Sequence, residues 1–133
     1  MTPETLEIGA EKMGWPESVQ YCKGKRLELV SIVTSELQQH IRTKLMEAKG
    51  EEQKEAWIGL RRSSLTGNWY WVNGETVGNT NWAKGEPGTP QDGQCAIMSL
   101  NSTKDFGWSD EDCCKAAHPI CYGSPDIFSL TKR

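Results

Sequence analysis

Five cysteines and two histidines are the residues of this 133-residue chain best suited to chemistry. The cysteines are Cys22, Cys95, Cys113, Cys114 and Cys121. No two of them have the C-x-x-C spacing of a zinc ribbon or a redox motif, and His40 and His118 lie far apart, so a structural zinc site is not expected. The favoured interpretation is two disulfides and one odd cysteine in an oxidising compartment. Five reduced, buried thiols in a cytosolic protein are the alternative.

Other signatures narrow the class of function. The chain holds no Ser/His/Asp or Cys/His set in a plausible catalytic arrangement, so we do not expect an enzyme. Its 15 basic and 18 acidic residues give a net charge of −3, which argues against a nucleic-acid-binding surface. No apolar run approaches the length of a membrane span. The sequon Asn101-Ser102-Thr103 makes Asn101 a candidate glycosylation site and favours secretion.

The first half of the chain must supply helices that position these groups. A short strand is predicted around residues 6–8. Trp15, Val19 and Cys22 then repeat at the i, i+4, i+7 spacing of a helix that buries one side. Gly24 is expected to end this helix.

A second helix is predicted to begin at Thr34 or Ser35, either of which can cap it, with Gln38 as the capping-box partner of Ser35. It is expected to end before Gly50. Its inward-facing residues are predicted to be Leu37, Ile41 and Leu45. His40 is expected to be exposed on the same helix.

The second half of the chain changes to the period-two pattern of strands. Four strands are predicted: Trp57–Leu60, Trp69–Val72, Gln94–Leu100 and His118–Tyr122. Asn73-Gly74 follows the second of them and predicts a tight hairpin. Helices followed by short antiparallel strands indicate one α+β domain over residues 1–122, with 123–133 as a C-terminal tail or linker.

A long polar stretch, Gly78–Gly93, separates the second and third of these strands. It is rich in glycine and also contains prolines, so we expect an irregular loop. Irregular loops of this length are uncommon in compact domains unless they bind something. The stretch is therefore the first place to look for a binding site.

A series of motifs runs along the chain in a specific order. They are Trp15 and Cys22, Trp57-Ile58-Gly59-Leu60, Trp69 and Trp71 before Asn73-Gly74, Asn81-Trp82, Gly85-Glu86-Pro87, Cys95, Trp108-Ser109-Asp110-Glu111-Asp112-Cys113, and Cys121-Tyr122. Together they make the chain resemble the short form of the C-type lectin-like domain over about residues 12–122. The resemblance implies two helices with short antiparallel sheets and a long irregular loop region.

The same resemblance implies a specific cysteine pairing, Cys22–Cys121 and Cys95–Cys113. It leaves Cys114 as the extra thiol, either free and buried or bridged to another molecule. It also implies a cis peptide bond before Pro87, with an ordinary trans turn as the alternative.

Sugar-binding members of this family hold their ligand through a calcium ion in the long loop, and calcium takes about six to eight oxygen ligands. The family pattern is Glu-Pro-Asn, a further Glu before the third cysteine, then Trp-Asn-Asp. Glu86, Pro87 and Asp110 match it, whereas Gly88 and Ser109 replace the two asparagines. Loss of these amide oxygens is expected to weaken calcium binding.

The remaining glutamate position of the pattern is Gly93, with Asp92 one residue earlier. The resemblance therefore implies three candidate calcium ligands, Glu86, Asp92 and Asp110. Ordinary surface carboxylates are the alternative for each of them. Arg61-Arg62 stands where auxiliary calcium ligands would lie, and we expect it to be a surface pair.

These expectations combine into one leading function, an extracellular carbohydrate-recognition module with weak or vestigial calcium-dependent sugar binding. The expected partner is a glycan or glycoprotein, and Ca²⁺ is the candidate cofactor. The candidate ligand-binding residues are Glu86, Pro87, Gly88, Asp92, Ser109 and Asp110. The alternative is a receptor ectodomain that recognises a protein ligand without calcium.

Overall fold

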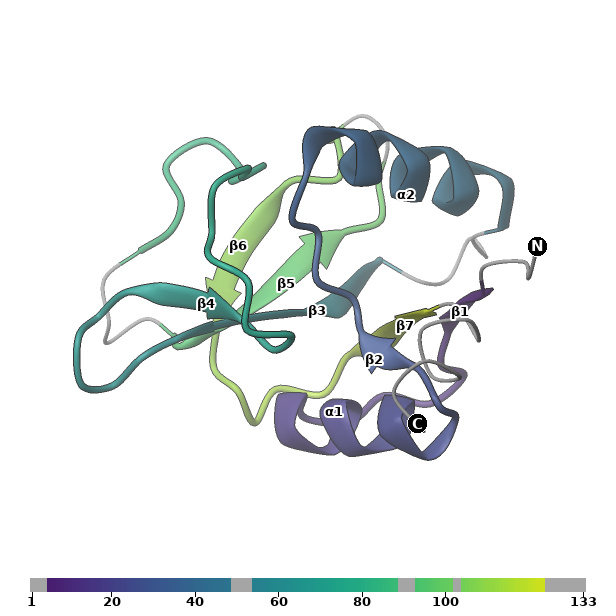
Figure 1. Cartoon of the computed structure of the whole chain (residues 1–133), viewed down its shortest axis with the longest axis horizontal. Coiled ribbons are helices and arrows are strands. Elements are labelled where there is room, and N and C mark those ends of the chain that lie inside the picture. Colours follow the sequence, from purple (N-terminus) through teal and green to yellow (C-terminus); the bar gives the residue numbers. More distant parts are fainter. Residues whose placement is uncertain (1–4, 49–53, 89–92, 102–103, 124–133) are drawn as a thin grey trace, which may run out of the picture.

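Two helices lie at opposite ends of a set of short strands. The computed structural model describes residues 5–48, 54–88, 93–101 and 104–123. In Figure 1, α2 (Ser35–Ala48) lies above the strands and α1 (Trp15–Gly24) lies below them. The expectations for Asp92, for Ser102 and Thr103 of the sequon, and for the tail beyond Gly123 fall outside the described residues.

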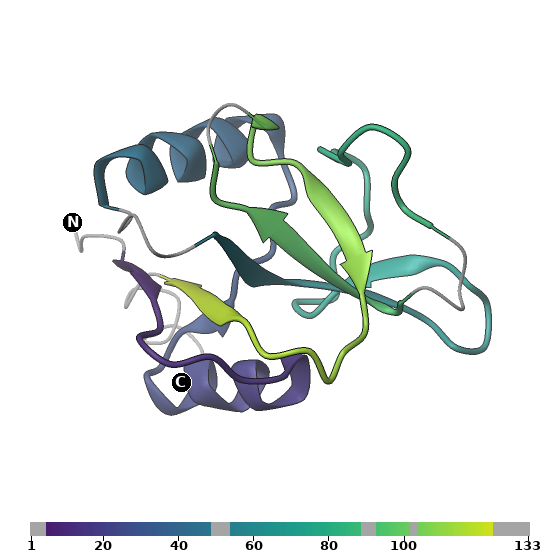
Figure 2. The same cartoon turned by 180° about the vertical axis from the view of Figure 1, so that it is seen from behind.

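In the described residues, seven strands form one mixed sheet. They are β1 (Thr5–Ile8), β2 (Glu28–Leu29), β3 (Glu55–Arg62), β4 (Trp69–Trp71), β5 (Cys95–Ser99), β6 (Trp108–Glu111) and β7 (His118–Gly123). The order is β1-β7-β3-β5-β6, with β2 added to β7 and β4 added to β3. Only the β3–β7 pairing is parallel; the other pairings among these strands are antiparallel, and Figure 2 shows β5 beside β6. The predicted α+β class is confirmed.

The alternation of side chains along β3 builds two cores, one on each side of the sheet. Ala56, Ile58 and Leu60 belong to the larger core, which also contains Ile41 of α2. Trp57 points the other way and joins the smaller core. Every one of these side chains is nearly inaccessible to solvent, so β3 is the central strand of the fold.

The smaller core lies against α1, which is fixed to the rest of the fold at both ends. At its start, the indole Nε1 of Trp15 donates a hydrogen bond of 2.9 Å to the carbonyl of Ile58. At its end, Cys22 forms a disulfide with Cys121 of β7, as predicted. The second predicted bridge, Cys95–Cys113, is also present.

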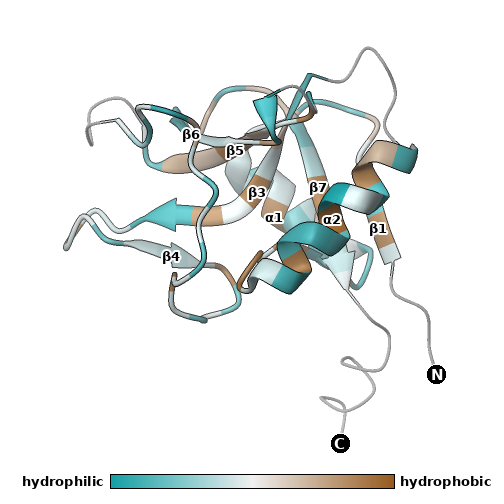
Figure 3. Ribbon diagram, turned by 90° about the horizontal axis from the view of Figure 1, so that it is seen from above, coloured by the Kyte–Doolittle hydropathy of each residue, from teal (hydrophilic) through white to brown (hydrophobic). Residues whose placement is uncertain are grey.

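The start of α2 decides between the two predicted caps. The hydroxyl of Thr34 accepts a hydrogen bond of 3.0 Å from the backbone N–H of Leu37, so Thr34 is the cap. The capping box predicted between Ser35 and Gln38 does not form, because the Gln38 side chain is buried and has no hydrogen-bond partner among the described residues. Figure 3 shows the alternating hydrophilic and hydrophobic bands of α2.

Two further expectations for these segments are wrong. His40 is half-buried rather than exposed, because its ring packs edge-on against Tyr122 with 6.4 Å between ring centroids. Asn73-Gly74 forms a turn in which the Gly74 N–H donates to the carbonyl of Trp71, but it does not close a hairpin. The hairpin of β4 is made with the preceding strand, β3.

Glycine at position 59 lets three strands approach closely. A Cβ atom there would lie 2.5 Å from the carbonyl oxygen of Leu29 and 2.8 Å from Cγ2 of Val72. The Gly59 N–H donates to Val30, and the Gly59 carbonyl accepts from Val72. Glycine is therefore required where β2 and the end of β4 meet β3.

Candidate ligand-binding face

The long loop is attached to β6 by its backbone. The N–H of Trp108 donates a hydrogen bond of 2.9 Å to the carbonyl of Asn81, and the N–H of Ala83 donates one of 2.8 Å to the carbonyl of Trp108. The Asn81 side chain donates to the carbonyls of Asp105 and Phe106. The loop is thus held at the same end of β6 that carries the family motif.

Four tryptophans pack together beneath this loop. The ring of Trp82 lies 4.9 Å from that of Trp69 and 5.8 Å from that of Trp108, between centroids. Trp108 in turn meets Trp71 edge-on at 5.4 Å. Trp71 and Trp108 are fully buried, whereas Trp69 and Trp82 are partly exposed. These two rings give the loop side of the fold an aromatic surface.

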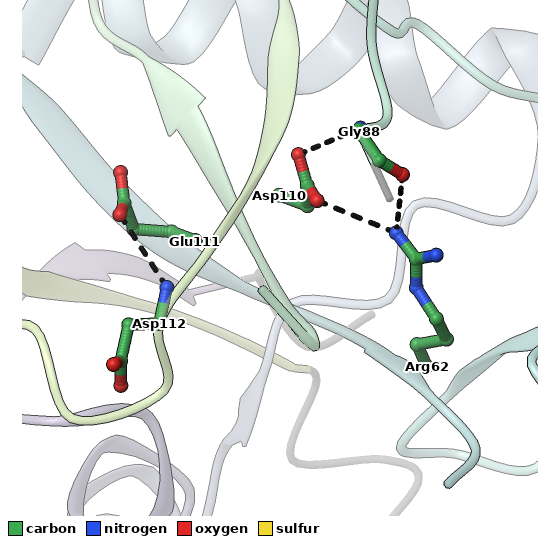
Figure 4. Close-up of polar contacts among 5 residues, drawn as sticks. All are labelled: Arg62, Gly88, Asp110, Glu111 and Asp112. Carbon is green, nitrogen blue, oxygen red and sulfur yellow. Dashed lines mark hydrogen bonds and ion pairs between the residues drawn. The ribbon is translucent and has the colours of Figure 1, made fainter. Parts of the chain in front are cut away.

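The carboxylate of Asp110 is buried beside this aromatic cluster and both of its oxygens are occupied. Oδ1 accepts a hydrogen bond of 2.9 Å from the backbone N–H of Gly88. Oδ2 lies 3.4 Å from Nη2 of Arg62, which also donates a hydrogen bond of 3.0 Å to the carbonyl of Gly88. Figure 4 shows this closed group of three, with Glu111 and Asp112 lying apart from it.

Arg62 is the functional candidate that sequence reasoning missed. Its side chain was expected on the surface, but it is buried, and its guanidinium lies over the ring of Trp69 at 4.6 Å. Arg62 and Trp69 are cross-strand partners on the β3–β4 hairpin, so their side chains share one face. The only sequence signal for its burial was its position two residues after Leu60, which places both side chains on the same face of β3.

Glu86 and Ser109 are placed differently from Asp110. The peptide bond between Glu86 and Pro87 is cis, as the resemblance implied, and the Glu86 side chain is half-buried. Ser109 precedes Asp110 on β6, so the alternation of the strand directs its side chain to the opposite side. The described structure therefore does not bring Ser109 together with Asp110.

Gly93, which stands at the glutamate position of the family pattern, lies tightly against β6. A Cβ atom at this residue would fall 2.4 Å from the backbone carbon of Glu111. A side chain cannot be accommodated here without moving the backbone. This close approach explains why the position is glycine. Because glycine stands in place of the family's glutamate, the loop has one carboxylate fewer.

These groups, as arranged, do not fit a calcium ion. Calcium requires several oxygens with free lone pairs, whereas Asp110 and the carbonyl of Gly88 are already directed to Arg62. The guanidinium would also repel a cation placed beside Asp110. No cluster of three or more histidine, cysteine, aspartate or glutamate side chains suited to a metal occurs in the part of the chain that the structure describes.

Cys114 lies outside this face and its expected burial is wrong. It carries a free thiol and is exposed. Its backbone N–H donates a hydrogen bond of 2.8 Å to the Asp112 carboxylate. The neighbouring residue, Cys113, is bonded to Cys95, so the thiol stands next to a disulfide in sequence.

The family model described as "Lectin C-type domain" matches residues 11–123. The chain belongs to the C-type lectin domain family. Members of this family are binding domains rather than enzymes, so the expectation of a non-catalytic protein agrees with the family.

Several relatives of this C-type lectin domain are named as selectins or receptors. E-selectin of Bos taurus is 32% identical over 123 residues, covering 89% of this chain and 24% of that protein. The low affinity immunoglobulin epsilon Fc receptor of Homo sapiens is 34% identical over 99 residues, covering 74% of this chain and 28% of that protein. The chain therefore spans about a quarter of the length of these relatives.

Solved structures give the same fold. Human lithostathine superposes with a TM-score of 0.80 at 22% identity, covering 91% of this chain and 92% of that one. The carbohydrate-recognition domain of the mouse scavenger receptor C-type lectin superposes with a TM-score of 0.76 at 26% identity, covering 93% and 91%. Neither helix of the described residues is long and apolar enough to cross a membrane.

Proposed function

We propose that this C-type lectin domain is an extracellular recognition module whose long-loop face binds a carbohydrate without calcium. The long-loop face is defined as residues 78–88 together with Arg62, Trp69 and Asp110. The observation that carries the proposal is the buried contact between Arg62 and Asp110, 3.4 Å apart. In this arrangement the positive charge that stabilises the Asp110 carboxylate comes from the protein.

A carbohydrate ligand is supported by the chemistry of the face and by one structural relative. Trp69 and Trp82 are partly exposed, and aromatic rings offer an apolar face to the C–H groups of a sugar ring. Thr80 and Lys84 of the same loop are exposed and offer polar groups to hydroxyls. The mouse scavenger receptor domain, 26% identical, is named as a carbohydrate-recognition domain.

Glycan binding in chelator tests this function. We expect glycan-array binding to be the same in EDTA and in calcium, and the melting temperature to be unchanged by calcium, because a ligand that does not bind the native state cannot stabilise it. Trp82→Ala should lose the binding, and Met46→Ala, at an exposed position on α2, should retain it. Binding that disappears in EDTA would contradict the proposal.

Recognition of a protein through the same face is the second candidate. It is supported by the receptor named for the Fc region of immunoglobulin epsilon, which is 34% identical to this chain. The replacements by Gly88 and Ser109 also remove amides that the family uses for sugars. A domain that binds no glycan on the array but binds a cell-surface protein, with Trp82→Ala inactive, would favour this candidate over the first.

An extracellular location is proposed on independent grounds. Two disulfides cross-link the described fold, which is typical of oxidising compartments. Asn101 is exposed and begins a sequon, so we propose it as a glycosylation site. Expression in a secretory host should give a mass that glycosidase treatment lowers, and Asn101→Gln should abolish that difference.

A further inference from the structure

A pocket opens on the opposite face of the β3–β4 hairpin from Arg62. The hairpin pairs Arg61 with Tyr70 and Arg62 with Trp69. Because side chains alternate along a strand, the two consecutive arginines point to opposite faces. Arg62 reaches the long-loop face, whereas Arg61 lines a pocket of about 280 Å³ between α1 and β4.

The walls of this α1–β4 pocket combine apolar surface with an exposed aromatic ring. Val19 of α1 and Leu29 of β2 are among its apolar lining residues. Tyr70 also lines it and is 43% exposed, so its ring is open to a ligand. A pocket of this size, with apolar walls and a few polar groups, fits a small ligand or one unit of a larger one.

Arg61 is held in place by stacking on an aromatic ring. Its guanidinium stacks over the indole of Trp15 at 5.2 Å, and that indole is itself held by its bond to the carbonyl of Ile58. Among the described residues, Arg61 has no carboxylate or carbonyl acceptor for its side chain. A guanidinium fixed by stacking is well suited to bind a carboxylate or a sulfate.

Glu28 supplies the complementary group in the same pocket. Its carboxylate has no hydrogen-bond or ion-pair partner in the described part of the chain, and burial raises its pKa. Arg61 and Glu28 line one pocket and yet are not paired with each other. A partly buried charged group is stabilised by a partner. Arg61 can therefore bind an acceptor group of a ligand, and Glu28 can bind a donor group.

We propose that the α1–β4 pocket binds an acidic monosaccharide unit, a sugar that carries a carboxylate or sulfate. Glu28 accepts hydrogen bonds from the sugar hydroxyls, and Tyr70 packs against the ring. Arg61 binds the acidic group together with Lys23, which also lines the pocket. A sugar supplies hydroxyl donors, an apolar ring face and an anionic substituent together. A bare anion would meet repulsion from Glu28 and gain nothing from Tyr70.

An NMR titration in EDTA tests the site independently of the long-loop face. The probes are methyl β-glucuronide and its uncharged analogue methyl β-glucoside, added to the ¹⁵N-labelled domain. We expect the glucuronide to shift amide signals in residues 19–29 and 59–72, and to bind at least about fivefold more tightly than the glucoside. Glycine, which is zwitterionic but has no hydroxyls, should bind weakly.

Substitutions of the residues that line the α1–β4 pocket test the role of each one in binding. Arg61→Gln should remove the preference for the glucuronide, and Arg61→Lys should restore part of it. Tyr70→Ala should weaken both sugars, whereas Tyr70→Phe should not. Glu28→Ala should weaken binding of the uncharged glucoside several-fold. The glucoside is used for this variant because, with the glucuronide, the loss of charge repulsion would offset the lost hydrogen bond. Lys44→Gln, at an exposed position on α2, controls for net charge.

Three results would overturn the proposal. One is equal affinity for glucuronide and glucoside, and another is glycine binding as tightly as the glucuronide. The third is a set of shifted signals centred on residues 78–88, which would leave the proposed function of the long-loop face intact and assign the sugar to that face alone. Loss of glycan-array binding in Trp82→Ala, with glucuronide binding retained, would show that the two sites are independent.

Discussion

Nη2 of Arg62 lies 3.4 Å from Oδ2 of Asp110, and the two side chains expose only 7% and 2% of their surface. The pair joins β3 to β6 across 48 residues of sequence. It places a positive charge beside the carboxylate at the position where the family resemblance implies a calcium ligand. The charge of Asp110 is thereby compensated within the chain.

Removal of Arg62 is expected to destabilise the domain. Arg62→Met should lower the free energy of unfolding by about 3 kcal/mol, because it leaves the Asp110 carboxylate buried and unpaired. The double variant Arg62→Met/Asp110→Leu should recover much of this loss. Urea unfolding of the two single variants and the double variant gives the coupling.

The exposed pair of Arg42 and Asp105 is a matched control for that cycle. Its atoms are closer, 2.7 Å apart, but the side chains are 30% and 63% exposed. Arg42→Met should therefore cost less than about 1 kcal/mol. An equal loss in the two arginine variants would contradict the role assigned to burial.

The helices and strands of this fold could be predicted where the spacing of apolar residues along the sequence determines them. Trp15 and Cys22 share one face of α1, and the alternation along residues 56–60 matches a strand buried on both sides. Asn73-Gly74 does form a turn, but the tight hairpin predicted there is wrong, because β4 pairs with the preceding strand rather than with the following segment.

The site could be predicted only in part, because its decisive contact is not local. Arginine is usually solvated, and nothing near Arg62 in sequence offers a carboxylate at strand spacing. The partner comes from β6, and its burial depends on Trp69 covering the guanidinium. The expected burial of Cys114 is likewise wrong, since its thiol is exposed.

The two disulfides should differ in their contribution to stability. Cys22–Cys121 spans 99 residues and Cys95–Cys113 spans 18. In the chain-entropy description, loops of these lengths correspond to about 4.7 and about 3 kcal/mol. Urea unfolding of each Cys→Ser double variant should show the larger loss for Cys22→Ser/Cys121→Ser. The reverse order would show that loop length does not govern the difference.

The Cys114 thiol should react in the folded protein. Because it is exposed, a maleimide should label one site per chain without denaturant, and Cys114→Ser should abolish the labelling. Cys114→Ser should leave the unfolding midpoint unchanged, since no disulfide is lost. Labelling that requires denaturant, or that persists in the variant, would contradict the placement of this thiol.

The cap of α2 distinguishes two adjacent hydroxyl residues. Thr34→Ala should lower the free energy of unfolding by about 1 kcal/mol, because the N–H of Leu37 loses its acceptor. Thr34→Ser retains the hydroxyl and should be close to the parent. Ser35→Ala should have little effect, since the Ser35 hydroxyl makes a long hydrogen bond of 3.4 Å to the neighbouring Glu36 carboxylate and does not cap the helix. Chemical unfolding monitored by circular dichroism measures all three.

Glu28 should reduce stability at neutral pH in the absence of a ligand. Burial raises its pKa above the ordinary 4.5, so the folded protein holds this proton more tightly than the unfolded chain does. The resulting penalty is complete above the folded-state pKa and vanishes as the pH falls below the unfolded-state pKa. Glu28→Gln should therefore stabilise the domain at pH 7 and lose that advantage near pH 4. Urea unfolding at the two pH values checks this, with Glu11→Gln as the exposed control. Two outcomes would contradict this: a variant less stable than the parent at pH 7, or a free energy of unfolding changed equally at both pH values. Either would show that the carboxylate already has a favourable partner. The α1–β4 pocket would then offer no free acceptor to a sugar hydroxyl.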